Sequence, residues 1–226
     1  MKAPLLAVLV VVAAASPGGL PAQVDVAARL QGRVPPAVAR AVQDLAAGTA
    51  ARGLPVEPLI QKAIEGGAKH VPADRVIAAV RALAVRMDEA AGALREGGIQ
   101  SPGADVVEGG AYALNAGLSA RQVRDLVRVS RPPYDAALTL RVAATLAALG
   151  VPAKKTADLV QDMIKAGRSP SELLDLPSEV QAGVARGATP AQAASGLAQA
   201  AAHAPGTGPP HDVPPGQAKP PNPHKP

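Results

Sequence analysis

A short phrase that recurs along the chain constrains its fold more than any other feature. In each copy a Gly is followed by a variable residue and then by Pro, Ser or Thr, and apolar residues follow about four and seven or eight positions later. The clear copies begin at Gly53, Gly117 and Gly150, and fainter ones begin at Gly167 and Gly187. Gly ends a helix because it adopts the left-handed conformation at little cost, and the hydroxyl or Pro residue starts the next helix. Each copy therefore predicts a tight corner between two helices.

Side chains with the right chemistry for capping support these corners. In a capping box, a Ser or Thr at the helix start and a Glu or Gln three residues later each bond the other's backbone amide. The candidate pairs are Ser119 with Gln122, Ser169 with Glu172, Ser178 with Gln181, and Thr189 with Gln192. His70-Val71-Pro72 has the ending of the phrase without the Gly, and the longest uninterrupted helix is expected from Pro72 to about Arg95. Its apolar stripe comprises Val76, Ile77, Val80, Leu83, Met87 and Leu94.

The spacing of the corners predicts an all-α fold for residues 23–203. Successive helix starts fall roughly 17 to 20 residues apart or near twice that, with an irregular stretch from about Gly97 to Gly117. Helices this short are marginal in water, so each has to bury its apolar face against neighbours. We therefore expect an array of short antiparallel helical hairpins, which is either α-solenoid-like or an irregular helical bundle. The composition agrees, because 48% of the residues are hydrophobic but only 1% are aromatic.

The first 22 residues have the pattern of a secretory signal peptide. One cation, Lys2, precedes an unbroken apolar run from Leu5 to Ala15, and a helix-breaking cluster follows at residues 16–19. The run is shorter than the roughly twenty residues needed to span a bilayer, so no transmembrane anchor is expected after cleavage. Cleavage is expected after Ala15 or after Ala22, and without Cys there is no lipoprotein anchor. The pattern predicts a periplasmic or secreted protein.

Residues 204–226 differ in composition from everything before them. This segment is rich in Pro and Gly and has few apolar side chains. Because Pro lacks an amide donor and disfavours the helical state of the residue before it, a disordered tail with extended character is expected. A solubilising end or spacer is the favoured role, with docking to a partner as the alternative.

Few residues have the types or spacings of a catalytic or metal site. The chain has no Cys, which excludes thiolate nucleophiles, disulfides and thiolate-bound metals. His70 stands alone in the folded part and has no evident catalytic partner. The other His residues, with one Asp, lack the helical spacing that prearranges metal ligands, and they are His203, His211, His224 and Asp212. Neither a cofactor nor a metal is expected.

Two pairs of carboxylates are candidates for a catalytic acid and base. Asp158 and Asp162 lie four apart, but Lys154 and Lys165 flank them, so a solvated ion-pair ladder explains all four residues. Asp105 and Glu108 have less context, and they carry the hypothesis of a hydrolase that acts on envelope polymers.

Four arginines form the most suggestive set. Arg121, Arg124, Arg128 and Arg131 have spacings of three, four and three, which would place them within about one quadrant of a helix. Arg holds phosphate and carboxylate with two hydrogen bonds, so this Arg ridge predicts a weak anion-binding site. The local segment 117–123 resembles the turn and the start of the recognition helix in bacterial helix-turn-helix regulators. A protein exported from the cell rarely meets DNA, so nucleic acid is the disfavoured ligand.

The sequence favours an exported, non-catalytic helical protein that serves as a protein-interaction or structural module of the bacterial envelope or secretome. This hypothesis follows from the large surface of a helical array and implies an unknown protein partner in the envelope or outside the cell. The alternative is an anion-binding module that uses the Arg ridge to hold an acidic polymer, an anionic lipid headgroup or nucleic acid. The mild net charge of +5 is compatible with either.

Overall fold

The computed structural model of the chain describes residues 25–203, so the expected signal peptide and the Pro-rich tail lie outside the described residues. Within these residues the fold is all-helical and contains no strand. The helices are α1 (Val26–Leu30), α2 (Pro36–Ala51), α3 (Glu57–Ala68), α4 (Ala73–Glu96), α5 (Ala104–Asn115), α6 (Ala120–Val129), α7 (Ala136–Ala148), α8 (Ala153–Lys165), α9 (Pro170–Ala185) and α10 (Pro190–His203). No helix between residues 25 and 203 has the length and apolar character needed to cross a bilayer.

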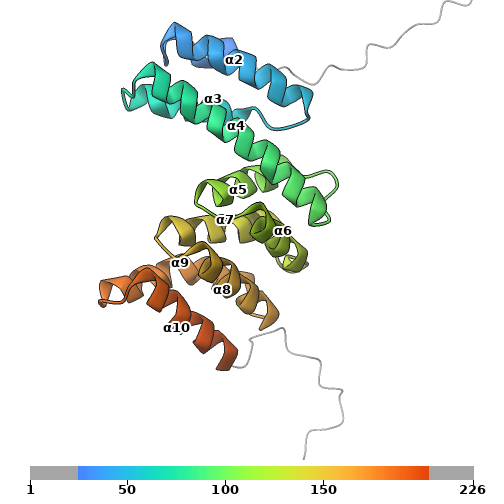
Figure 1. Ribbon diagram of the computed structural model, residues 1–226, viewed down its shortest axis with the longest axis vertical. Helices are drawn as coiled ribbons and strands as arrows, with labels where there is room; N and C mark the ends of the chain where they lie inside the picture. The colour runs from blue at the N-terminus through green and yellow to red at the C-terminus, as the bar shows by residue number, and fades with distance from the viewer. Residues whose placement is uncertain (1–24, 204–226) are drawn as a thin grey trace, which may run out of the picture.

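Packing is local along the chain. Each helix packs mainly on helices that are one or two positions away in the sequence. As a result α2, α4, α6, α8 and α10 contact one another in succession, and α5, α7 and α9 form a second succession beside them. Figure 1 shows the helices following one another along the long axis of the molecule, from α2 at one end to α10 at the other.

The corners form as the repeated phrase predicts. Gly53, Gly117, Gly150, Gly167 and Gly187 all have positive φ angles. After α5, for example, the Gly117 amide donates to the Leu114 carbonyl at 3.1 Å and the Leu118 amide donates to the Ala113 carbonyl at 3.0 Å, which is the Schellman pattern. Gly32 and Gly98 also have positive φ, although neither belongs to a copy of the repeated phrase. At the corner without Gly, His70 takes the left-handed conformation with φ 52°.

Three of the four expected capping boxes are present. Gln122 and Ser119 bond each other's backbone amides at 2.8 and 3.3 Å, and the boxes at Ser169 and Thr189 have the same geometry. The expected box at Ser178 is wrong, because α9 continues through Pro177 as far as Ala185. Buried side chains on both sides of the proline, Leu173, Leu176 and Val180, hold this helix against its neighbours.

The long helix α4 connects the two halves of the fold. It runs from Ala73 to Glu96, as expected, and it packs on α2, α3, α5 and α6. All of the predicted stripe is buried except Ile77, which is only partly buried.

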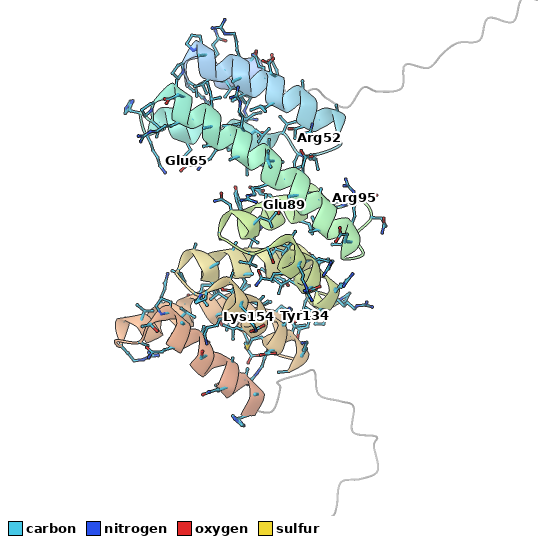
Figure 2. The ribbon with its side chains drawn as sticks, viewed as in Figure 1. Arg52, Glu65, Glu89, Arg95, Tyr134 and Lys154 are labelled. Atoms are coloured by element: carbon cyan, nitrogen blue, oxygen red, sulfur yellow. The ribbon has the colours of Figure 1, made fainter. Side chains whose placement is uncertain are left out.

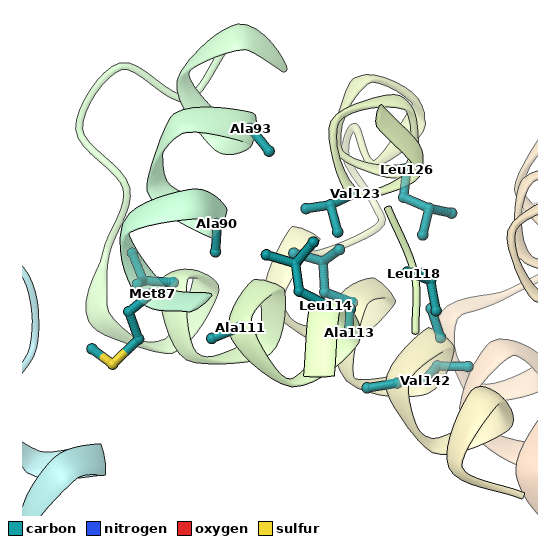
Figure 3. Packing of buried hydrophobic residues seen from close by; sticks show 14 of the residues in the cluster. Met87, Ala90, Ala93, Ala111, Ala113, Leu114, Leu118, Val123, Leu126 and Val142 are labelled. Carbon is teal, nitrogen blue, oxygen red and sulfur yellow. The ribbon is translucent and has the colours of Figure 1, made fainter. Parts of the chain in front are cut away.

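Small residues allow close packing where α4, α5, α6 and α7 meet (Figure 3). A Cβ atom added at Gly110 of α5 would lie 3.0 Å from the Ala90 Cβ of α4. A Cβ at Gly109 would lie 3.2 Å from the Ala137 carbonyl oxygen of α7. The adjacent glycines therefore let α5 approach helices on two sides, where bulkier residues would force the helices apart.

Candidate functional site

The structure changes the expected Arg ridge at one end. Arg121, Arg124 and Arg128 lie on α6, but α6 ends at Val129, so the prediction that Arg131 shares this helix is wrong. Two features explain the early end. The Ser130 hydroxyl donates to the Leu126 carbonyl at 2.8 Å, and Arg131 precedes Pro132, where helical backbone is disfavoured. The Arg131 side chain is exposed and folds back to the Arg128 carbonyl, with Nε 3.4 Å from the oxygen.

Arg124 joins two helices. Its Nε lies 3.2 Å from Oδ1 of Asp125, and its Nη1 lies 3.4 Å from Oε2 of Glu96 on α4. The hydrogen bond to Asp125 is the main reason that the pKa of Arg124 is raised. Only 24% of this side chain is exposed. Arg124 is thus a structural link between α4 and α6, with its charge already paired.

Arg121 and Arg128 remain open to solvent. Their side chains are 82% and 53% exposed, and they lie 3.8 and 3.6 Å from the carboxylate of Asp125 between them. Arg128 also donates through Nη2 to the Glu96 carbonyl at 3.2 Å. Because Asp125 neutralises part of the charge, an anion at this surface would meet Arg121, Arg128 and Arg131 rather than all four guanidinium groups.

Helix α8, which packs on α6, also carries exposed charged side chains. The expected pair between Lys154 and Asp158 is present, with Nζ 2.7 Å from Oδ2, and this hydrogen bond raises the pKa of Lys154. Lys165 contacts the Gln161 side chain at 3.4 Å instead of the expected Asp162. All four charged groups of the expected ladder are exposed, which agrees with a solvated helix face.

The two successions of helices in the C-terminal part carry opposite charge. The cations on α6 and α8 are Arg121, Arg124, Arg128, Lys154, Lys155 and Lys165, against the carboxylates of Asp125, Asp158 and Asp162. We define the basic surface as the exposed cations of α6, α8 and the residue after α6, namely Arg121, Arg128, Arg131, Lys154, Lys155 and Lys165. The carboxylates on α5 and α9, which we term the acidic row, are Asp105, Glu108, Glu172, Asp175 and Glu179. The only cation within α5, α7 and α9 is Arg141 of α7, and Arg168, just before α9, pairs with Glu172 at 3.1 Å.

The other sequence candidates do not come together. The Asp105 carboxylate accepts from the Val106 amide at 2.9 Å, and the Glu108 carboxylate accepts from the Tyr112 hydroxyl at 2.8 Å. His70 lies at the corner before α4 and His203 ends α10, whereas His211, His224 and Asp212 lie outside the described residues. Among residues 25–203, no three His, Asp or Glu side chains are grouped so that they could hold a metal ion.

The sequence analysis gave no role to the two tyrosines, which behave differently. The Tyr134 hydroxyl donates to the Arg168 carbonyl at 2.5 Å, so it ties the segment before α7 to the corner between α8 and α9. Tyr134 is labelled in Figure 2. Tyr112 is 44% exposed and pairs only with Glu108 on its own helix in the described structure. Partial burial, and then the hydrogen bond to Glu108, raise the pKa of Tyr112 to about 12.

Comparison with known proteins adds no assignment. No family model, no curated protein and no solved structure matches this chain. The functional argument therefore depends on the geometry of the chain itself.

Proposed function

We propose that residues 25–203 form an α-solenoid-like array of helical hairpins that acts, after export to the periplasm or the outside of the cell, as a non-catalytic protein-interaction or structural module. The observation that supports this proposal is the local packing, in which helices contact those one or two positions away. Repeated packing of this kind builds an extended molecule with a large surface for its length.

The surface of such an array suits a macromolecular partner. Several consecutive helices each present an outer face, so a partner could span more than one hairpin. The exposed faces of α6 and α8 are charged, and large apolar side chains are exposed on other helices, as at Val85 (63%) and Leu174 (52%). Isolated exposed apolar residues are ordinary, so the extended shape carries the proposal, with these residues as points of contact.

The experiment is affinity capture from the envelope fraction combined with cross-linking. The full chain and a chain that lacks residues 204–226 are used as baits, and cross-links are mapped by mass spectrometry. We expect a partner that both baits retain, with cross-links on the exposed faces of two or more consecutive helices. Recovery of no partner, or cross-links confined to the tail, would contradict the proposed module.

A second candidate function is anion binding at Arg121 and Arg128, the two exposed arginines of the expected Arg ridge on α6. The exposure of Arg121 and Arg128 favours it, because both guanidinium groups retain much of their surface despite Asp125. Retention on anionic lipid vesicles is expected to weaken steeply between low and physiological salt and to fall in the variant R121A/R128A. Arg81, which is exposed on α4, provides the matched control R81A. Retention that survives R121A/R128A would exclude the ridge as the site.

A further inference from the structure

The C-terminal part of the chain carries both halves of an electrostatic pair. The basic surface lies on α6 and α8, and the acidic row lies on the neighbouring helices α5 and α9. On α4, by contrast, four cations are balanced by four carboxylates on the same helix. On α6 and α8, cations outnumber carboxylates by six to three, although Asp125 and Asp158 pair with some of these cations, and the excess charge is available to an outside group of opposite sign.

The most exposed cations lie near the starts of α6 and α8, and two exposed carboxylates lie on one face of α9. Arg121 is the second residue of α6 and Lys154 is the second residue of α8, and their side chains are 82% and 84% exposed. Because α6 and α8 pack side by side, these two cations lie at corresponding ends of neighbouring helices. On α9, Asp175 and Glu179 are exposed and lie four residues apart, which places them on one helix face.

We propose that the basic surface binds the acidic row of a second copy of this chain. The charge complementarity between these surfaces identifies the occupant, because cations are in excess on α6 and α8 and carboxylates are in excess on α5 and α9. This inference rests on the proposed interaction function and names one partner for it. Since the two surfaces differ, the contact is heterologous, and each bound copy leaves one basic and one acidic surface open for further copies.

Such an association depends strongly on salt. Charges at the rim of an interface act mainly through long-range attraction, and the screening length falls from about 30 Å at 0.01 M salt to about 8 Å at 0.15 M. We therefore expect concentration-dependent oligomers of the full chain at low salt. Their dissociation constant should rise about tenfold or more at physiological salt.

Sedimentation velocity of the full chain and of two charge-reversed variants tests the proposal. The first variant, R121E/K154E, leaves five carboxylates against four cations on α6 and α8, and the second, D175K/E179K, leaves three carboxylates against three cations on α5, α7 and α9. Each variant alone is expected to sediment as a monomer, because its two surfaces no longer carry opposite net charge. Glu at the second position of a helix is favourable to the helix dipole, which offsets the repulsion from Asp125 or Asp158 four residues later, so R121E/K154E is expected to fold normally. Circular dichroism of each variant checks this expectation.

Mixing the two variants is the decisive step. The acidic row of the first variant is unchanged and still matches the unchanged basic surface of the second. An equimolar mixture is therefore expected to recover oligomers that neither variant forms alone. The variant R81E, with its charge change on α4, is the matched control and should associate like the unmodified chain.

Three results would overturn the proposal. These are a monomer at low salt and high concentration, oligomers that persist in both reversed variants, and a mixture that stays monomeric. If the monomer instead binds anionic lipid vesicles through Arg121 and Lys154, the basic surface belongs to a lipid site. Capture of an envelope partner by a chain that stays monomeric would leave the interaction module standing and remove only self-association.

Discussion

The N-terminal helices α1 to α3 and the C-terminal helices α5 to α10 use the same corner chemistry but pack differently. In the C-terminal part, α7 lies among α5, α6, α8 and α9. In the N-terminal part, α3 packs on α1, α2 and α4, and the succession of odd-numbered helices is interrupted before α5. Helix α4 joins the two parts, and its length compensates for the interruption.

Charge distinguishes α4 from the C-terminal part. On α4, the cations Arg75, Arg81, Arg86 and Arg95 are balanced by the carboxylates of Asp74, Asp88, Glu89 and Glu96. Ion pairs such as Arg52 with Asp88 (2.8 Å) and Arg86 with Glu89 (2.7 Å) then satisfy charges locally. Figure 2 labels one partner of each pair, Arg52 and Glu89. The comparison teaches that repeated corners fix the path of the chain, whereas the distribution of charge differs between α4 and the helices that follow it.

The largest expected effect comes from cavities in the two parts. Leu140 of α7 and Leu59 of α3 are both fully buried. We expect L140A to lower the free energy of unfolding by about 3–5 kcal/mol and L59A by about 2–3 kcal/mol, because helices enclose α7 on more sides and leave its cavity less able to collapse. Urea unfolding measures both values. Equal losses of unfolding free energy in L140A and L59A would contradict the claim that α7 is enclosed on more sides than α3.

A glycine contact offers a second test, within the N-terminal part. A Cβ at Gly67 of α3 would lie 2.3 Å from the Arg33 carbonyl oxygen, which belongs to the backbone before α2. We expect G67A to cost about 1–3 kcal/mol, because the backbone has to move. Gly92 of α4 is the control, since its Cβ would meet nothing within 4 Å, and G92A should stabilise by about 0.5–1 kcal/mol. A neutral G67A would show that α3 does not approach this loop.

The tyrosines test a tie that is confined to the C-terminal part. Y134F removes the hydroxyl that bonds the corner after α8, and a loss of about 1 kcal/mol is expected. Y112F removes a hydrogen bond to an exposed carboxylate on the same helix and should change the free energy of unfolding by less than about 0.5 kcal/mol. Thermal unfolding of both variants measures the two losses. A larger loss in Y112F than in Y134F would refute the assigned contacts.

The corner before α4 has His70 at the position where the corners of the repeated phrase have Gly. A side chain in the left-handed conformation is strained, so H70G is expected to stabilise by about 0.5–1 kcal/mol after the added flexibility of the unfolded chain is allowed for. G117A, at φ 102°, should have the opposite sign. Chemical denaturation measures each change, and a destabilising H70G would indicate that the His70 side chain has a stabilising contact.

The smallest expected effect is the pH dependence of Glu65 on α3. Hydrogen bonds from Lys69 and Lys62 lower its pKa from 4.5 to about 2. The pair therefore contributes to stability fully above about pH 4.5 and loses the contribution as the pH falls towards 2. Because these side chains are exposed, the difference between the unmodified chain and E65Q should be about 0.5 kcal/mol or less at pH 7. A difference that is unchanged at pH 2 would contradict the lowered pKa.

The local part of the fold could be predicted from the sequence, because a corner needs only neighbouring residues. The glycine at position 117 and the Ser119 box depend on backbone geometry within a few residues, and both are confirmed. Ser178 shows the limit of this reasoning. Its spacing to Gln181 satisfies the local rule, but the buried residues around Pro177 keep α9 continuous, and burial depends on helices that are distant in sequence.

The candidate site was less predictable for the same reason. The spacing of the four arginines is periodic, but the early end of α6 separates Arg131, and Glu96 of α4 pairs with Arg124. The pairing of Arg124 with Glu96 has no local sequence signal, and the early end of α6 has only one, the proline after Arg131. The opposite charges of the two successions become visible only when it is known that α6 packs on α8 and that α5 and α9 both pack on α7.

Hydrogen exchange of the full chain carrying G67A tests the central claim, that stability is passed only between neighbouring helices. If the helices form an array, the substitution should accelerate amide exchange in α1 to α3 and in the first half of α4, and leave α7 to α10 as protected as in the unmodified chain. Acceleration by the same factor in α7 to α10 would mean that the helices unfold as one cooperative bundle, and the array would be refuted.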